Sequence, residues 1–296
     1  MTSQAPDNTL SRVAVPGGGQ LLEYRLQKTK QARYFLFLPA QHGPHSRVLA
    51  AIHGISRNVQ ELLAAFIPYA QLHGVVLLAP LFTGKDCTAY QRLGGRGQRS
   101  DHLLNEMLDQ VQAEHALDCR RLFLFGYSGG AQFAQRYAFA YPNRVCAVVL
   151  GAPGWFTMPD KRAAFPRGIA HSKRRRDLHL DPNAFLDVPA CVFVGARDTR
   201  IDKQLNCSPR VVQAQGRHRL QRAGRWVRAM QDAARTLNKP TLYTRQVLPG
   251  AGHSFNECVG KGRMAKRSFE YFLATAYNTQ MDSPASTSAA TENVCA

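Results

Sequence analysis

The chain has 296 residues, of which 45% are hydrophobic, and this is typical of one large globular domain or two small ones. Its formal net charge is +18, with 38 lysines and arginines against 20 acidic residues, which raises the question of nucleic-acid binding. No apolar run approaches the roughly 18 residues of a membrane span, and residues 1–20 lack the basic and apolar regions of a secretory signal.

The 7 cysteines are odd in number and include no CxxC pair, so they predict neither a disulfide framework nor a zinc site. Cys146 and Cys191 lie within apolar runs, where a buried thiol is the ordinary expectation. We therefore expect a reduced, cytoplasmic protein without a bound metal.

The positive charge is spread over many segments. Its densest run is "HSKRRRDLHL" at 171–180. A second group recurs at helical spacing and predicts a solvated helix face; it consists of Arg217, Arg219, Arg222, Arg225 and Arg228. No recognition-helix, RNA-binding or zinc-finger pattern accompanies either group. We expect a basic surface of general electrostatic effect rather than a dedicated nucleic-acid site.

Strand and helix patterns alternate along the chain. Two stretches, 21–28 and 33–39, predict an opening hairpin. Further strands are predicted by short apolar runs at 47–53, 74–80, 121–128, 144–153, 190–198 and 241–253. Helices are predicted at 101–116, 131–141, 217–237 and 261–276. Apolar strands that alternate with helices are typical of a mostly parallel sheet covered on both faces, so the expected class is α/β.

Three segments fall outside this alternation. Residues 1–19 precede the first predicted strand and are interpreted as an N-terminal extension. The stretch 154–189 contains aromatic, proline and basic residues without a clean period, and we expect a lid over the carboxyl edge of the sheet. Residues 278–296 are small and polar and predict a disordered tail. The main domain is therefore expected to span 20–277.

The pentapeptide GYSGG at 126–130 lies between a predicted strand and a predicted helix. A nucleophilic serine on such a sharp turn needs small residues two positions to either side, which is the pattern G-x-S-x-G. A helix that begins beneath the serine also favours developing negative charge. We therefore expect Ser128 to be a nucleophile.

A serine nucleophile requires a general base, and the base requires an orienting carboxylate. The segment "VFVGARDTRID" places Asp198 just beyond a predicted strand, with Asp202 as the alternative. The segment "LPGAGHSF" follows the last predicted strand and contains His253. Both segments lie at carboxyl ends of strands, where open α/β sheets collect their sites. The expected triad is Ser128, His253 and one of these two aspartates.

Acyl transfer also needs N–H donors directed at the oxyanion. One donor is expected from Gly129, and the other from Gly54 or Ile55 in the loop "AAIHGISRN". His53, which begins this loop's turn, is expected to support it rather than act as a second base.

Three aromatic residues are candidates to contact the substrate. Tyr127 flanks the nucleophile, and Trp155 and Phe156 follow the strand at 144–153. The alternative for Trp155 and Phe156 is that they anchor the insertion on the core. The basic residues at 173–176 favour an anionic substrate if they face the site, and are otherwise merely solvated.

Five segments together resemble the α/β-hydrolase superfamily: "IHGISRN", "FGYSGGAQFAQRYAFAYPNRV", "GAPGW", "VFVGARD" and "GAGHSF". They are most similar to bacterial esterases related to polyhydroxybutyrate depolymerases, feruloyl esterases and dienelactone hydrolases, over about residues 20–277. The resemblance implies an eight-stranded, mostly parallel sheet and no cofactor. It also implies a triad of Ser128, Asp198 and His253, with backbone donors near Ile55 and Gly129. Dienelactone hydrolases typically have a cysteine where this chain has its serine.

The sequence therefore predicts a serine hydrolase that cleaves small-molecule carboxylic esters through an acyl-enzyme. A thioesterase, peptidase or lactonase with the same triad is one alternative. A basic protein that binds nucleic acid or an anionic membrane is the other.

Overall fold

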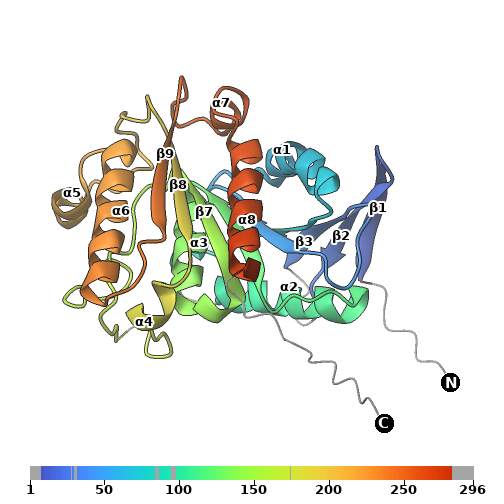
Figure 1. Cartoon of the computed structure of the whole chain (residues 1–296), viewed down its shortest axis with the longest axis horizontal. Helices are drawn as coiled ribbons and strands as arrows, with labels where there is room; N and C mark the ends of the chain where they lie inside the picture. The colour runs from blue at the N-terminus through green and yellow to red at the C-terminus, as the bar shows by residue number, and fades with distance from the viewer. Residues whose placement is uncertain are drawn as a thin grey trace, which may run out of the picture.

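The computed structural model describes residues 8–281 apart from 28, 30–31, 84–86, 95–97 and 174, and it describes side chains only as far as 277. A nine-stranded sheet in the order β1-β2-β3-β5-β4-β6-β7-β8-β9 forms its centre (Figure 1). The strands are β1 (Thr9–Val15), β2 (Gly19–Arg25), β3 (Arg33–Leu38), β4 (Val48–Ile52), β5 (Val76–Leu81), β6 (Leu122–Tyr127), β7 (Val145–Gly151), β8 (Ala190–Gly195) and β9 (Tyr243–Leu248).

The sheet is antiparallel at one end and parallel elsewhere. β1, β2 and β3 pair antiparallel, as do β3 and β5, whereas the neighbouring pairs from β5 to β9 are parallel. Strands β4, β6 and β8 are buried along their whole length, which is the pattern of strands covered on both faces. This agrees with the α/β class expected from the alternation of strands and helices.

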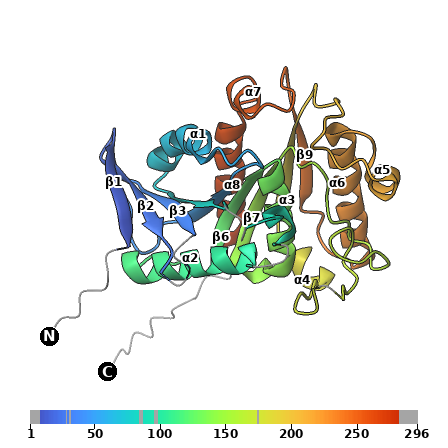
Figure 2. The same ribbon diagram turned by 180° about the vertical axis from the view of Figure 1, so that it is seen from behind.

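Helices cover both faces of the sheet. α2 (Ser100–His115), α3 (Gly129–Ala140) and α6 (Arg219–Thr236) pack on one face, which Figure 2 views. α1 (Val59–Leu72) and α8 (Met264–Met281) pack on the other. The shorter helices are α4 (Pro182–Phe185), α5 (Pro209–Gln215) and α7 (Phe255–Gly260), with 3-10 turns η1 (Tyr90–Arg92) and η2 (Pro142–Arg144). None of the helices that the structure describes has the length and apolar composition needed to cross a membrane.

The ninth strand corrects the expected count of eight. β1 lies in the segment interpreted as an N-terminal extension, residues 1–19, and pairs with β2 from Thr9 to Val15. Its side chains are almost all exposed, so it carries no hydrophobic signal and is held mainly by backbone hydrogen bonds. At the other end, α8 continues into the predicted tail as far as Met281, and residues 282–296 lie outside the described part of the chain.

The segment 154–189 packs against the side of the domain. Several of its apolar side chains belong to the core beneath α2, α3 and α6; they are Phe156, Phe165, Ile169, Leu180, Phe185 and Val188. Its short helix α4 lies at the edge of the sheet opposite α7, which follows the carboxyl end of β9 (Figure 1). This packing does not support the expected lid over the carboxyl edge, because the apolar side chains are already buried against the core.

Candidate active site

Two glycines make the turn between β6 and α3 possible. A Cβ on Gly126 would lie 2.2 Å from the carbonyl oxygen of Gly130, and a Cβ on Gly130 would lie 2.1 Å from that of Ile52. Both distances are far below any van der Waals contact, so neither position accepts a side chain without moving the backbone. The spacing G-x-S-x-G is thus a steric requirement of this turn.

Ser128 occupies the tip of the turn with φ 51° and ψ −107°, a backbone conformation that L residues rarely adopt. Two backbone hydrogen bonds stabilise it. Its N–H donates to the carbonyl oxygen of Gly151 at 2.7 Å, and its own carbonyl accepts from the N–H of Gln132 at 3.2 Å. The surrounding chain therefore holds the serine in a strained conformation, as is common at functional sites.

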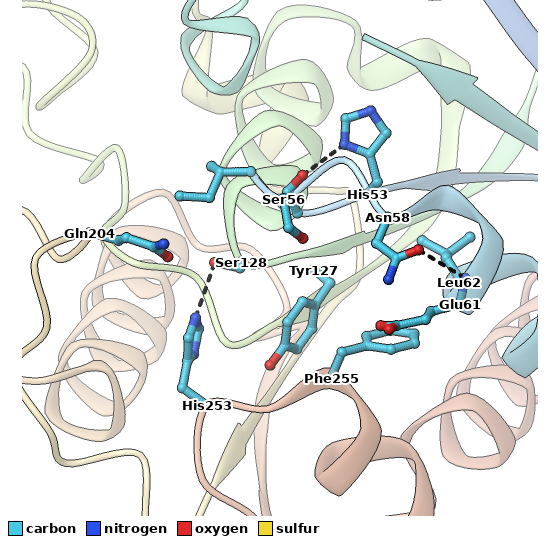
Figure 3. A pocket seen from close by; sticks show the side chains of 12 residues that line it. His53, Ser56, Asn58, Glu61, Leu62, Tyr127, Ser128, Gln204, His253 and Phe255 are labelled. Carbon is cyan, nitrogen blue, oxygen red and sulfur yellow. Dashed lines mark hydrogen bonds between the residues drawn. The ribbon is translucent and has the colours of Figure 1, made fainter. Parts of the chain in front are cut away.

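The side chains of Ser128, His253 and Asp198 form a continuous chain of hydrogen bonds. Ser128 Oγ lies 3.1 Å from His253 Nε2, and His253 Nδ1 lies 2.9 Å from Asp198 Oδ2 (Figure 3 shows the serine and histidine). The Asp198 side chain is 1% exposed and that of His253 is 21% exposed. Of the two candidate aspartates, Asp198 contacts the histidine, whereas Asp202 is bonded to the guanidinium of Arg219.

The loops that carry Asp198 and His253 are bound to each other. A Cβ on Gly195, the last residue of β8, would lie 2.4 Å from the carbonyl oxygen of Ala251. The N–H of Arg197 donates to that same oxygen at 2.9 Å. The ring of Tyr127 stacks on that of His253, with centroids 5.7 Å apart. These contacts hold together two segments that are more than fifty residues apart in the chain.

The backbones of Ile55 and Gly129 lie close to each other at the turn that carries Ser128. An added Cβ on Gly129 would lie 3.3 Å from the nitrogen of Ile55, so these two backbones are in close approach. Within the described part of the chain, neither N–H donates to another group. Gly54 lies beside them, since a Cβ placed there would meet the Ser128 Cβ at 3.8 Å. Unsatisfied N–H groups beside a nucleophile are what stabilisation of an oxyanion requires.

His53 lies behind this loop and is 1% exposed. Its Nδ1 is 2.8 Å from the carbonyl oxygen of Gly54, and its Nε2 accepts from the N–H of Phe82 at 3.0 Å. The hydroxyl of Tyr90 donates to the His53 carbonyl at 2.9 Å. Burial lowers the pKa of His53 to about 4, so its ring is neutral at ordinary pH. The arrangement fits the supporting role expected from the sequence.

No protein-family model matches the chain. Its structure is similar to poly(aspartic acid) hydrolase-1 from Sphingomonas sp. KT-1, with a TM-score of 0.69 and 24% identity over 82% of this chain and 93% of that one. It is equally similar to a poly(3-hydroxybutyrate) depolymerase from Bordetella parapertussis, with a TM-score of 0.69 and 24% identity over 87% and 90%. The chain has the α/β-hydrolase fold.

One curated protein also matches this chain by sequence. It is a bifunctional acetylxylan esterase/xylanase from Neocallimastix patriciarum, 22% identical over 127 residues. The match covers 42% of this chain and 18% of that enzyme, so the chain spans less than a fifth of the relative's length.

The site around Ser128 opens into a cavity of about 200 Å³. Its wall includes the predicted residues Gly54, Ile55, Tyr127, Ser128 and His253. Apart from His53, the other lining side chains were not candidates from the sequence; they are Ser56, Asn58, Glu61, Leu62, Gln204 and Phe255 (Figure 3). These residues follow β4, β8 and β9 at their carboxyl ends. Their location after the carboxyl ends of predicted strands was the one feature of the sequence that could have indicated them.

Trp155 and Phe156 do not line this cavity. Phe156 is fully buried and stacks on Trp226, with ring centroids 4.8 Å apart. The Trp155 ring lies under the guanidinium of Arg136, 4.4 Å from its centroid. Each ring thus packs against a side chain of the domain and not against the cavity. Their position agrees with the alternative that these residues anchor the segment 154–189.

The arginines at helical spacing do not form the uniformly solvated face expected of them. Arg219 and Arg222 are buried, whereas Arg217, Arg225 and Arg228 are exposed. The basic run at 171–180 is described except for Arg174, and its described residues do not line the cavity. Among the described residues, no cluster of three or more histidine, cysteine or carboxylate side chains is placed to hold a metal ion.

Proposed function

We propose that the chain is a serine hydrolase that cleaves carboxylic esters through an acyl-enzyme. The observation that carries this proposal is the unbroken hydrogen-bond chain from Asp198 through His253 to Ser128, on a strained turn beside unsatisfied N–H groups. A nucleophile within reach of a base, with that base oriented by a third group, is the general signature of covalent acyl transfer.

The proposed reaction begins when Ser128 Oγ attacks the ester carbonyl and His253 Nε2 accepts the hydroxyl proton. The N–H groups of Ile55 and Gly129 then donate to the oxyanion of the tetrahedral intermediate. Collapse of that intermediate breaks the bond to the alcohol, which receives its proton from His253. A water molecule, deprotonated by the same imidazole, releases the acid and restores the serine.

Asp198 orients the histidine throughout this cycle. Its Oδ2 accepts from the Nδ1–H, which leaves Nε2 free of a proton and directed at the serine. The buried carboxylate also stabilises the imidazolium that forms in each half-reaction.

The cavity favours esters with a short acyl group. Its volume is about 200 Å³, and Ser56, Asn58, Glu61 and Gln204 place polar groups in its wall. A long aliphatic chain would fill more space and meet polar side chains that it cannot satisfy. The sequence relative is named as an acetylxylan esterase, and an acetyl group is small enough to fit in this cavity. We therefore propose acetyl and similarly short esters as the substrates of this chain.

We propose a reducing, cytoplasmic setting for this reaction. Cys119, Cys146, Cys191, Cys207 and Cys258 are free thiols. Burial raises the pKa of Cys119 and of Cys258 to about 12, which leaves both thiols protonated and unreactive.

Labelling with a fluorophosphonate probe tests the proposed function. The probe should add once to the wild-type protein and not to Ser128→Ala, as read by intact mass. The wild-type enzyme should then hydrolyse p-nitrophenyl acetate faster than the octanoate, and a panel of thioester, lactone and peptide substrates separates the related activities. A folded Ser128→Ala protein that hydrolyses the acetate at the wild-type rate would contradict the proposal.

The basic-protein alternative makes a different prediction. Binding of nucleic acid or anionic vesicles through the surface arginines would weaken steeply with added salt. Tight, salt-dependent binding by a protein that the probe does not label would favour that alternative over ester hydrolysis.

A further inference from the structure

Arg219, the first residue of α6, lies directly behind the proposed triad. Its side chain is 1% exposed, and its Nη1 is 3.4 Å from Asp198 Oδ1 and 2.7 Å from Asp202 Oδ2. The other oxygen of Asp198 accepts from His253. We propose that Arg219 is a positioning residue that fixes Asp198 for His253 and, with Asp202, sets the charge that the imidazole experiences. This inference rests on the proposed function and deepens it.

The same guanidinium also connects the triad to the cavity wall. Asp202 Oδ1 accepts the N–H of Gln204 at 2.9 Å, and its carbonyl accepts the N–H of Leu205 at 3.1 Å. Gln204 lines the cavity. Asp202, which is 38% exposed at its side chain, thus shapes the turn that presents Gln204, while Arg219 holds it from the buried side.

The charges in this cluster determine in which direction each substitution shifts the protonation of His253. Two carboxylates, one guanidinium and a neutral imidazole carry a net charge of −1, and protonation of His253 brings this cluster to zero. Without Arg219, the cluster would become more negative and would favour the imidazolium more strongly. Without the charge of Asp202, it would become more positive and would disfavour the imidazolium. The two changes therefore shift the protonation of the base in opposite directions.

Other titratable groups around this cluster stay constant in both variants. Asp198 interacts electrostatically with His218, Tyr127 and Cys258, and Arg222 lies close to His218. Burial raises the pKa of Tyr127 and raises that of Cys258 to about 12, so both are neutral over the working range. Burial lowers the pKa of His218, which favours its neutral form.

Arg222, one turn further along α6, is a matched control. It is as buried as Arg219, but it donates to the backbone carbonyls of Gly216, Gly154 and Asn206 at 2.9, 2.5 and 2.8 Å. It has no ion pair with any described carboxylate. Its removal tests the cost of losing a buried arginine from this helix without breaking a contact to the triad.

The experiment is the pH profile of kcat/KM for p-nitrophenyl acetate, which reports groups that ionise in the free enzyme. At low pH kcat/KM falls as the base becomes protonated, and this acid limb of the profile should shift with the nearby charge. Its midpoint should move up by about one pH unit in Arg219→Met and down by a similar amount in Asp202→Asn. Arg219→Lys, which keeps the charge, should stay closer to wild type than Arg219→Met. Arg222→Met should lower Tm and leave the acid limb in place.

Opposite shifts would support the positioning role, since loss of packing alone moves no acid limb. If Arg219→Met does not fold, Asp202→Asn still decides, because its side chain is partly exposed; an unshifted or upward-shifted limb there would overturn the inference. The two proposals fail separately. Loss of activity in Ser128→Ala with coincident pH profiles would reject only the role of Arg219, whereas full activity in Ser128→Ala would reject the hydrolase mechanism itself.

Discussion

Two histidines line the same cavity and differ in almost every physical respect. His53 follows β4 and is 1% exposed, whereas His253 follows β9 and is 21% exposed at its side chain. Both ring nitrogens of His53 lie against backbone groups of Gly54 and Phe82. Both ring nitrogens of His253 lie against side chains, those of Ser128 and Asp198.

The difference shows that hydrogen-bond partners, and not residue type or nearness to the cavity, separate a supporting histidine from a candidate base. A ring enclosed by backbone groups has no nitrogen left for a proton from the substrate, and burial disfavours its charged form. A partly exposed ring between a hydroxyl and a carboxylate can gain and lose a proton without breaking the fold. Four predictions test this contrast, in order of decreasing effect.

His253→Ala should have the largest effect on catalysis. We expect kcat for p-nitrophenyl acetate to fall by about 10⁴-fold or more, because the serine loses its base. The melting temperature should stay close to that of wild type, because the ring is partly exposed. Steady-state rates and thermal unfolding of the same preparation measure both quantities. A variant that loses its fold along with its activity would remove the contrast with His53.

His53→Ala should have the opposite effect, with a large loss of stability and a small loss of catalytic rate. The buried N–H of Phe82 would lose its acceptor, and the ring would leave a cavity, so we expect a loss of about 3 kcal/mol in the free energy of unfolding. The rate should fall by only about 10- to 100-fold, because the nearby N–H of Ile55 would be less well placed. Urea unfolding and steady-state kinetics check these values. A loss of rate as large as that in His253→Ala would assign His53 a direct part in the chemistry.

The pH dependence of the free energy of unfolding should also reflect the lowered pKa of His53. Its pKa is lowered from 6.5 to about 4 in the folded protein, so the unfolded chain takes up the proton first as the pH falls. Its contribution to stability is complete above pH 6.5 and is lost progressively between pH 6.5 and 4. The total loss is about 3 kcal/mol. Urea unfolding at several pH values should therefore show a shallower dependence in His53→Gln than in wild type. Parallel curves would contradict the assignment.

Tyr90→Phe should have the smallest effect. It removes one buried hydrogen bond, from the hydroxyl to the carbonyl oxygen of His53, and keeps the ring that packs against the histidine. We expect a loss of about 1 kcal/mol in stability and a change in kcat of less than about tenfold. Thermal unfolding and initial rates are sufficient to measure it. A larger kinetic effect would mean that the loop at Ile55 depends on this contact more than on His53.

Much of the candidate site was predictable because its signals are local. The turn at Ser128 needs glycines at fixed spacing, since Gly126 and Gly130 have no room for a Cβ. The alternation of apolar strands with helices indicated an α/β sheet, and the carboxyl ends of its strands indicated where Asp198 and His253 would meet. Each of these inferences depends on a few neighbouring residues.

Other features of the site depended on contacts with residues that are distant in the chain. Asp198 and Asp202 are four residues apart on one loop. Asp198 contacts both His253 and Arg219, whereas the Asp202 carboxylate is bonded to Arg219. Trp155 follows its strand as a pocket residue would, yet it packs against Arg136.

The sequence by itself determined the strained serine turn, the α/β class and the order of the candidate triad, because short-range sterics and hydrophobic periodicity do not depend on distant partners. Only the tertiary structure decided which aspartate contacts the histidine, that an exposed edge strand joins the sheet, and that Arg219 is buried behind the site. These outcomes depend on contacts between segments far apart in the chain, and the local sequence of either segment does not specify its partner.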